Sequence, residues 1–208
     1  PGARGRDQQG GSLGMSAGGL GRVETRRAVL FTEDDPLVLE SGAQLAPVEV
    51  AFETYGTLNP ARSNAVFVHH ALTGDAHAAG HHGDPARRGW WDRLIGPGRP
   101  IDSERFFVVS PNLLGGCRGT TGPSSIDPVT GRRYGLEFPM FSVGGLNTVH
   151  RRLLDHLGIE RLHAALGGSL GGMQALQWAI DDPQAMTLCA PICASSELSA
   201  MNIAFSTV

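Results

Sequence analysis

Apolar runs and amphipathic segments alternate along the second half of the chain. Residues 162–169 and 185–196 are short apolar runs, whereas residues 147–158 and 170–182 repeat their apolar side chains with helical spacing. The first of these helical segments closes at Gly158, a residue type typical of helix C-termini. Strands that alternate with helices in this way form a parallel sheet covered by helices. The sequence therefore predicts an α/β fold.

Three further stretches extend the predicted sheet toward the N-terminus. Residues 44–54 alternate apolar and polar side chains in their second half, which is the period of a half-buried strand, and residues 65–72 and 105–112 are β-rich runs suited to strands buried on both faces. Residues 112–146 then join strand to helix through many Gly, Pro, Ser and Thr residues. Because so long a connection in a compact domain is usually functional, we expect an ordered loop that forms part of a binding site.

Composition limits the classes of function. The 208 residues suffice for one hydrophobic core, and 41% hydrophobic with 18% charged residues is typical of a folded domain. A formal net charge of −3 offers no basic footprint for nucleic acid, and no apolar run reaches the roughly 18 residues that a membrane-spanning helix requires. With three cysteines and no signal peptide, we expect a cytoplasmic protein in which Cys189 and Cys193 are buried, inert thiols.

The two ends of the chain differ from its middle. Residues 1–22 are rich in glycine and lack periodicity, so we expect a disordered segment, within which Met15 is a plausible start. Residues 23–208 are expected to form the folded part. The chain ends in an apolar stretch without a cap, a turn or a polar tail, and we therefore expect it to be a fragment of a longer protein.

One serine occupies the turn between an apolar run and a helical segment. Ser169 lies in the sequence GGSLGG, which matches the pattern Gly-x-Ser-x-Gly of a nucleophile elbow, a turn on which the hydroxyl projects above the sheet. The alternative is a glycine-rich bend that binds phosphate. The spacing does not fit G-x-G-x-x-G, however, and no lysine follows the second glycine pair as it would in a P-loop. We therefore predict that Ser169 is a nucleophile.

Two backbone amides are candidates for an oxyanion hole. The amide of Leu170 follows the serine at the start of the predicted helix, where free N–H groups stabilise negative charge. A second donor is expected from the loop after an earlier strand. The amide of Leu72 in the sequence HHALTG has that position, with Gly74 allowing the chain to turn closely. The same residues also fit an ordinary tight turn.

Histidine is abundant, but its placement does not complete a catalytic triad. Five of the eight histidines lie close together before the serine, and their spacing fits neither H-E-x-x-H nor a zinc finger. We expect no metal there, and assign these residues to polar loop positions with one or two packed under a strand. After Ser169 the chain contains Asp181, Asp182 and Glu197 but no histidine, so either the general base lies elsewhere or Ser169 belongs to no triad. The clustered histidines are His69, His70, His77, His81 and His82.

Six longer motifs run from the first predicted strand to the serine: VEVAFETYGTLN, HHALTGDAHAAG, GWWDRLIGPGRPID, FFVVSPNLLGGCRGTTGPSSIDP, LLDHLGI and GGSLGGMQALQWA. Together they resemble the homoserine O-acyltransferases over roughly residues 23–208. The resemblance implies the N-terminal part of an α/β-hydrolase catalytic domain, a mostly parallel sheet flanked by helices. It also implies that Ser169 is the nucleophile and that the backbone N–H groups of Leu72 and Leu170 form the oxyanion hole.

The resemblance further implies a reaction and its partners. The family transfers acetyl or succinyl from a CoA thioester to the hydroxyl of L-homoserine in methionine biosynthesis, through an acyl-serine and a ping-pong sequence. This implies acyl-CoA as co-substrate, no cofactor, and a homodimer formed through a lid of helices. The family's acid, general-base histidine, lid and last strands lie downstream, so C-terminal truncation would explain the missing base. The alternatives are another acyltransferase or esterase of the same fold, or a non-catalytic degenerate copy.

The chain of 208 residues is expected to show little or no turnover by itself, because without a general base only binding and oxyanion stabilisation remain. The measurement is the release of free thiol from acetyl-CoA or succinyl-CoA in the presence of homoserine. Acylation of Ser169 at the rate typical of a complete enzyme would contradict this expectation.

Overall fold

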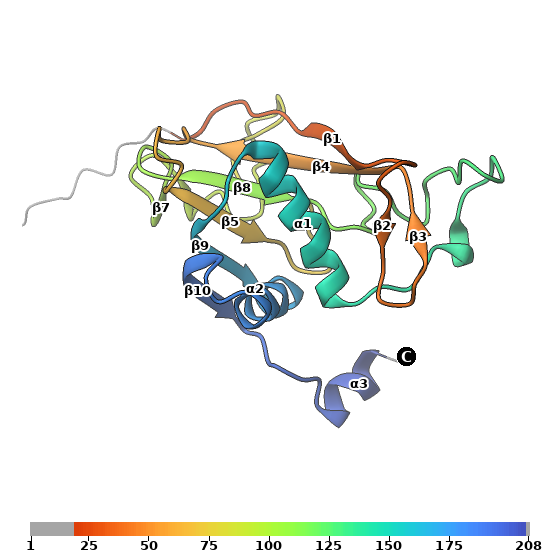
Figure 1. Ribbon diagram of the computed structural model, residues 1–208. Coiled ribbons are helices and arrows are strands. Elements are labelled where there is room, and N and C mark those ends of the chain that lie inside the picture. The colour runs from red at the N-terminus through yellow and green to blue at the C-terminus, as the bar shows by residue number, and fades with distance from the viewer. Residues whose placement is uncertain (1–18, 207–208) are drawn as a thin grey trace, which may run out of the picture.

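A six-stranded sheet forms the centre of the protein in this computed structural model, which describes residues 19–206 (Figure 1). The strands lie in the order β1, β4, β8, β5, β9, β10, and in that order comprise Arg26–Phe31, Val48–Tyr55, Phe107–Pro111, Ala65–His69, Leu162–Gly168 and Met186–Ile192. The helices are α1 (Val143–Leu157), α2 (Leu170–Asp181) and α3 (Ala200–Ser206), with a 3-10 turn, η1, at Gly135–Glu137. Two small sheets pair β2 (Leu37–Val38) with β3 (Gln44–Leu45) and β6 (Ile95–Gly96) with β7 (Ile101–Asp102).

The predicted α/β fold is confirmed. Strands β8, β5, β9 and β10 run parallel, and α1 and α2 lie in the connections that lead into and out of β9. Strand β4 pairs antiparallel with β8, and β1 pairs antiparallel with β4 at one edge of the sheet. The sequence patterns do not reveal β1, β2, β6 or β7, and the single strand predicted at residues 44–54 is divided into β3 and β4. Strand β1 begins with two exposed arginines, and strands of two residues are too short to show a period.

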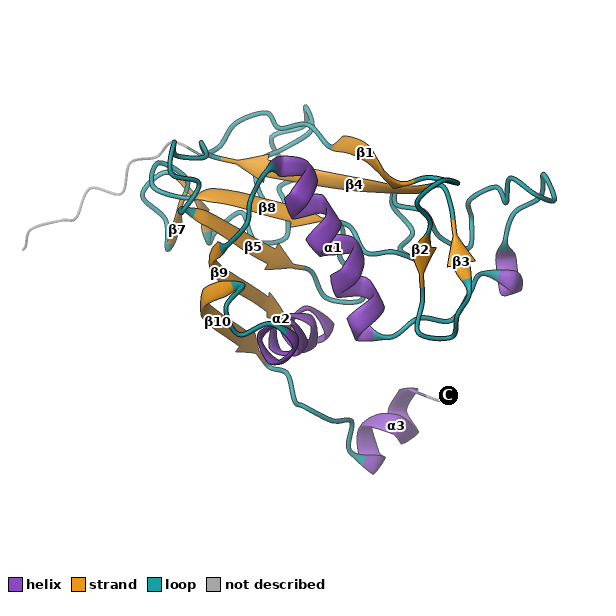
Figure 2. Cartoon of the chain, viewed as in Figure 1, coloured by secondary structure: helices purple, strands orange, loops and turns teal. Residues whose placement is uncertain are grey.

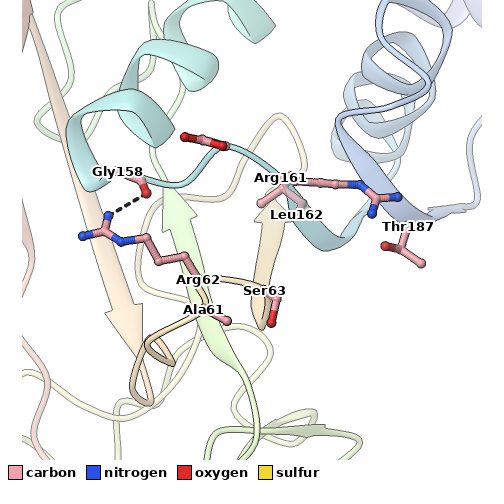
Figure 3. A pocket seen from close by; sticks show the side chains of 8 residues that line it. Ala61, Arg62, Ser63, Gly158, Arg161, Leu162 and Thr187 are labelled. Atoms are coloured by element: carbon pink, nitrogen blue, oxygen red, sulfur yellow. Dashed lines mark hydrogen bonds between the residues drawn. The ribbon is translucent and has the colours of Figure 1, made fainter.

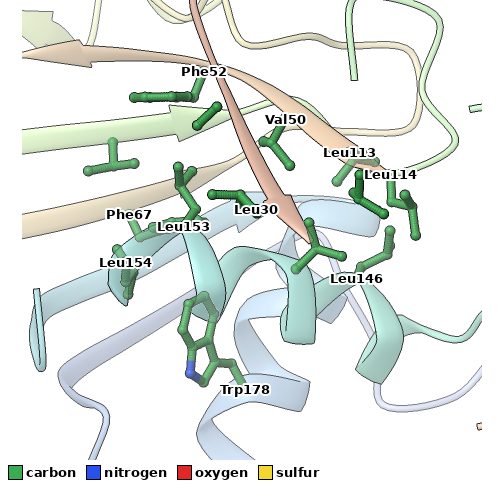
Figure 4. Packing of buried hydrophobic residues seen from close by; sticks show 14 of the residues in the cluster. Leu30, Val50, Phe52, Phe67, Leu113, Leu114, Leu146, Leu153, Leu154 and Trp178 are labelled. Atoms are coloured by element: carbon green, nitrogen blue, oxygen red, sulfur yellow. The ribbon is translucent and has the colours of Figure 1, made fainter. Parts of the chain in front are cut away.

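Apolar side chains fill both faces of the sheet. Helices α1 and α2 cover one face (Figures 1 and 2), where Leu153 and Trp178 pack with Phe67 of β5 in one hydrophobic core (Figure 4). On the other face a second core packs Val66 and Val68 of β5 against the connection between β5 and β8. Successive residues of β5 therefore enter different cores, as predicted for a strand buried on both faces.

Helix α1 begins earlier than the sequence pattern predicts. The periodicity indicates residues 147–158, whereas the helix starts at Val143 and includes two glycines in its first turn. The Oγ of Ser142 accepts a hydrogen bond from the amide of Gly145 (3.2 Å), and this N-cap offsets the low helix propensity of glycine. Gly158 ends the helix with a φ of 68°, so the predicted C-cap is confirmed.

The other two helices are short. Helix α2 matches the segment predicted at residues 170–182, and α3 follows an exposed connection after β10 (Figure 1). None of the helices in the described part of the chain is long and apolar enough to cross a membrane.

The described residues include the last part of the segment expected to be disordered. Residues 1–18 lie outside them, but the main chain of Arg22 forms a parallel bridge with His81. In addition, the amide of His81 donates to the carbonyl of Gly21 (3.0 Å). Gly21 and Arg22, which the sequence pattern assigns to the disordered segment, therefore make main-chain contacts with the connection that follows β5.

The two cysteines near β10 are not fully buried as expected. Cys193 is exposed, because it follows β10 at the start of an exposed connection, and the expectation for this residue is wrong. Cys189 is half-buried, and partial burial raises the pKa of its thiol. Strand β10 is an edge of the described sheet, which explains the exposure.

Two histidines lie in the helix-covered core. His69, at the end of β5, and His150, on α1, are fully buried with their ring centroids 5.4 Å apart, and both rings contact Phe67. Among the described residues, none forms a hydrogen bond with their ring nitrogens. Burial penalises the charged imidazolium, so it lowers the pKa of His150 to about 3 and holds that of His69 well below its usual value. Both rings are therefore neutral at neutral pH.

The stability of the protein is expected to fall as the pH is lowered below about 6.5. In the unfolded chain His150 gains a proton near its ordinary pKa, whereas in the folded protein the pKa is about 3, so acid favours unfolding. Between about pH 6.5 and about pH 3, the free energy of unfolding falls by up to about 1.4 kcal/mol per pH unit. His150→Leu should flatten the dependence of the free energy of unfolding on pH, measured by urea denaturation. His156→Leu, at an exposed position of α1, should keep the wild-type slope; equal slopes in all three proteins would contradict the prediction.

Candidate active site

The turn between β9 and α2 has the geometry of a nucleophile elbow. Ser169 adopts φ 55° and ψ −121°, a conformation that residues other than glycine rarely occupy and that costs about 1–3 kcal/mol. Its amide donates to the carbonyl of Ile192 on β10 (3.0 Å), and its carbonyl accepts a hydrogen bond from the amide of Met173 in α2 (3.0 Å). Main-chain bonds on both sides thus hold the strained residue, which lies exposed at the carboxyl end of β9.

Glycines make this turn sterically possible. A Cβ atom on Gly167 would lie 2.5 Å from the carbonyl carbon of Gly171 and 2.7 Å from the carbonyl oxygen of His69. A Cβ atom on Gly171 would collide with the same His69 oxygen. Both glycines of the Gly-x-Ser-x-Gly pattern are therefore required, because the backbones of β5, β9 and α2 meet there. Gly168 differs, since nothing lies within 4 Å of the Cβ that it would carry.

The two predicted oxyanion donors line one cavity. Leu72 lies in a tight turn closed by a hydrogen bond from the amide of Gly74 to the carbonyl of Ala71 (2.9 Å), and Leu170 is the first residue of α2. Within residues 19–206, no group accepts a hydrogen bond from either leucine amide. Both leucines border a cavity of about 510 Å³. Unpaired N–H donors at a common cavity are what an oxyanion hole requires.

The long loop after β8 forms much of the remaining cavity wall. It contributes the apolar side chains of Leu113, Leu114 and Phe141. Two hydrogen bonds hold the loop against β4. The amide of Ala51 donates to the Oγ1 of Thr120 (3.0 Å), and the amide of Glu49 donates to the Oγ1 of Thr121 (2.9 Å). These contacts support the prediction of an ordered loop that takes part in binding.

His70 joins the two loops that border the cavity, a role that sequence reasoning missed. Its Nδ1 lies 2.6 Å from the carbonyl oxygen of Ala71, and its Nε2 lies 3.2 Å from the amide of Leu113 and 3.1 Å from the Oδ1 of Asn112. Burial lowers the pKa of His70 and so favours the neutral ring. The turn also packs on this ring, since a Cβ on Gly74 would lie 2.8 Å from the Cβ of His70. Its place directly after a buried parallel strand is the signal that points to such a role.

Two of the carboxylates that follow the serine, Asp181 and Asp182, have partners at the far end of α2. Asp181 ends α2, where it accepts a hydrogen bond from Gln177 (2.8 Å), and Asp182 pairs with Arg151 (2.9 Å). In the part of the chain that the structure describes, no side chain is hydrogen-bonded to the hydroxyl of Ser169. The described residues therefore contain the predicted nucleophile and the predicted oxyanion donors, without a base hydrogen-bonded to the serine.

A second cavity lies at the opposite, amino end of the parallel strands (Figure 3). It has a volume of about 350 Å³ and contains two arginines. Arg62 donates to the carbonyls of Gly158 (2.6 Å) and Leu157 (3.1 Å), and Arg161 donates to that of Gln184 (3.0 Å). Because both guanidinium groups are engaged by the backbone, and because ligands of open α/β sheets bind at the carboxyl ends of strands, the first cavity is the better candidate.

A strained serine after a parallel strand, two obligatory glycines and unpaired amides at a cavity match the arrangement expected for a serine nucleophile on an α/β sheet. Residues 64–206 match the family described as alpha/beta hydrolase fold. The chain belongs to this family.

Within it, the resemblance to homoserine O-acyltransferases is confirmed. The chain is 63% identical over 191 residues to the homoserine O-succinyltransferase of Nocardioides sp. (92% of this chain, 52% of the relative). It is 51% identical over 188 residues to the homoserine O-acetyltransferase of Methanosphaerula palustris (90% and 38%). Among solved structures, it is similar to homoserine O-acetyltransferase from Bacillus anthracis (TM-score 0.80, 34% identity, 86% and 49% covered). It is also similar to esterase E22 (TM-score 0.79, 38% identity, 88% and 50%). The chain spans about half the length of the curated relatives it matches.

Gly171→Ala is expected to destabilise the protein by about 1–3 kcal/mol or more, because the added Cβ collides with the carbonyl oxygen of His69. Helix propensity alone would make the alanine variant more stable by about 1 kcal/mol. A loss of stability therefore indicates the collision with the His69 carbonyl oxygen. Gly168→Ala is the matched control and should change the free energy of unfolding by less than about 0.5 kcal/mol. Thermal unfolding of the two variants decides the question: a Gly171→Ala protein as stable as Gly168→Ala would rule out the close approach.

Proposed function

We propose that the protein acts as a homoserine O-acyltransferase, moving an acetyl or succinyl group from its CoA thioester to the hydroxyl of L-homoserine. The observation that carries this proposal is the exposed Ser169 on a strained turn, with the unpaired amides of Leu72 and Leu170 at one cavity. The names of the relatives support the same reaction. Because the chain spans about half of their length, we assign the activity to a protein that also carries the family's remaining part.

The proposed reaction has two halves. The Oγ of Ser169 attacks the thioester carbonyl carbon and gives its proton to a general base, while the carbonyl oxygen becomes an oxyanion that accepts hydrogen bonds from the amides of Leu72 and Leu170. The C–S bond then breaks, CoA leaves as the thiol, and the serine remains acylated. In the second half the homoserine hydroxyl loses its proton to the base and attacks the acyl-serine. The O-acyl product leaves, and Ser169 regains a proton.

The acid and the base of this scheme are proposed to lie outside the 208 residues. All eight histidines precede Ser169, whereas α/β-hydrolases place the acid and then the histidine after the serine. The fully buried, neutral rings of His69 and His150 are enclosed in the core, where they cannot reach substrate. This supports a base supplied by a later segment.

Ester hydrolysis is the second candidate, because the chain is also 38% identical to esterase E22. The two reactions differ in whether homoserine or water attacks the acyl-serine. The higher identity to homoserine O-acyltransferases, 63% and 51% against 38%, favours transfer.

Further parts of the proposal concern the setting of the reaction. We propose acyl-CoA as the co-substrate, with no cofactor needed for acyl transfer itself, and a role in methionine biosynthesis. A cytoplasmic location fits the three free thiols, which persist in a reducing compartment. We also propose that the longer protein is a homodimer and that neither nucleic acid nor a membrane is its partner.

Ser169→Ala in the longer protein is expected to lower homoserine-dependent release of thiol from acyl-CoA by about three orders of magnitude or more, because no acyl-serine can form. The assay compares acetyl-CoA with succinyl-CoA, each with and without homoserine. Ser63→Ala, which changes a serine at the opposite end of β5, should keep wild-type activity. Full activity of Ser169→Ala would exclude this serine as the nucleophile. Release of thiol at the same rate with and without homoserine would favour hydrolysis over transfer.

A further inference from the structure

A buried carboxylate on β4 lies outside the site described above. Glu53 is fully buried, and its ion-pair partners among the described residues are two histidines rather than an arginine. Its carboxylate accepts hydrogen bonds from the hydroxyls of Thr25 (2.8 Å) and Tyr55 (2.7 Å), from the Nδ1 of His77 (3.1 Å) and from the Nε2 of His82 (2.7 Å). A buried negative charge is costly unless positive charge or hydrogen bonds compensate it. This carboxylate therefore sits in an environment suited to a cation.

Three of these side chains, Glu53, His77 and His82, are of the types that bind metal ions. One carboxylate oxygen of Glu53 and one ring nitrogen each of His77 and His82 lie within 4.8 Å of one another. In tetrahedral zinc sites, bonds of about 2.0–2.2 Å hold the ligand atoms about 3.3–3.5 Å apart, so these atoms need to approach one another by up to about 1.4 Å to surround one centre. Two imidazoles and one carboxylate occupy three positions and leave a fourth for water.

The hydrogen bonds around the carboxylate are divided in a way that suits an ion. Each oxygen accepts one bond from a hydroxyl and one from an imidazole: Thr25 and His82 contact Oε1, whereas Tyr55 and His77 contact Oε2. An ion that replaces the two imidazole protons leaves both hydroxyl bonds in place, and such bonds orient a ligating carboxylate. The oxygen of Tyr55 is itself fixed, because it accepts hydrogen bonds from two backbone amides.

An ion can reach this cluster from solvent. The side chain of His82 is 48% exposed and borders a cavity of about 300 Å³ together with Thr25. The rings of His77 and His82 are tilted by 36° with their centroids 3.9 Å apart. The exposed position of His82 leaves its ring room to turn toward an ion.

Contrary to the expectation from histidine spacing alone, we propose that Glu53, His77 and His82 bind one divalent transition-metal ion of the zinc class, with water in the open position. The site is separate from acyl transfer, since none of the three residues borders the cavity at Leu72 and Leu170. It joins β4 to the connection that follows β5, and that connection covers the second core. An ion bound there stabilises the fold on the face of the sheet away from α1 and α2.

Zinc binding by the full-length protein, freed of metal with a chelator, tests the proposal. Titration with zinc chloride, followed by calorimetry, should show one ion per chain with micromolar or tighter affinity. His82→Ala should bind zinc at least about 100-fold more weakly, because it removes one of three ligands at a position exposed enough to tolerate alanine. His81→Ala is the matched control, since it removes the neighbouring histidine and should bind as the wild type does.

Thermal unfolding provides a second readout. Zinc should raise the Tm of the wild type and of His81→Ala but not that of His82→Ala. Absence of stoichiometric binding at micromolar zinc, or unchanged affinity in His82→Ala, would overturn the proposal. Ser169→Ala should bind zinc normally, so the outcome is independent of the proposed acyl transfer.

Discussion

Three backbone segments meet at the carbonyl oxygen of His69, and the geometry of the active site depends on this contact. The end of β5, the end of β9 and the start of α2 converge there, which excludes side chains from Gly167 and Gly171. The same convergence places Ser169 between strand and helix and sets the start of the turn that carries Leu72. Main-chain contacts therefore position the predicted nucleophile and both predicted amide donors, whose proposed role does not involve the leucine side chains.

The parts of the fold that the sequence predicts are those with a regular period. Strands β5, β8, β9 and β10 and helices α1 and α2 each carry a pattern long enough to recognise, and their order defines the parallel sheet. The start of α1 escaped prediction because it depends on one capping bond from Gly145 to Ser142 rather than on periodicity. Strand β1 was not predicted, because its sequence lacks a strand pattern and its extended conformation depends on pairing with β4.

The candidate site shows the same division. Ser169, Leu72 and Leu170 follow from a local motif and its place between a strand and a helix, and the structure brings the two leucines to one cavity. The roles of His70 and Glu53 could not be predicted, since each depends on partners distant in sequence. His70 contacts the amide of Leu113, 43 residues later in the chain, and Glu53 contacts the ring of His82, 29 residues later. Motif spacing along the chain contains no trace of such contacts. The triad acid and base remain predictions about residues beyond this sequence.

The hydrogen bond between the amide of Ser169 and the carbonyl of Ile192 has a consequence for how the nucleophile is maintained. It ties the strained serine to β10, which pairs in parallel with β9. Loss of this bond removes one of the two main-chain restraints on Ser169, and the strain then favours an ordinary helical or extended conformation. The pairing of β10 with β9 and the conformation of the candidate nucleophile are therefore thermodynamically linked.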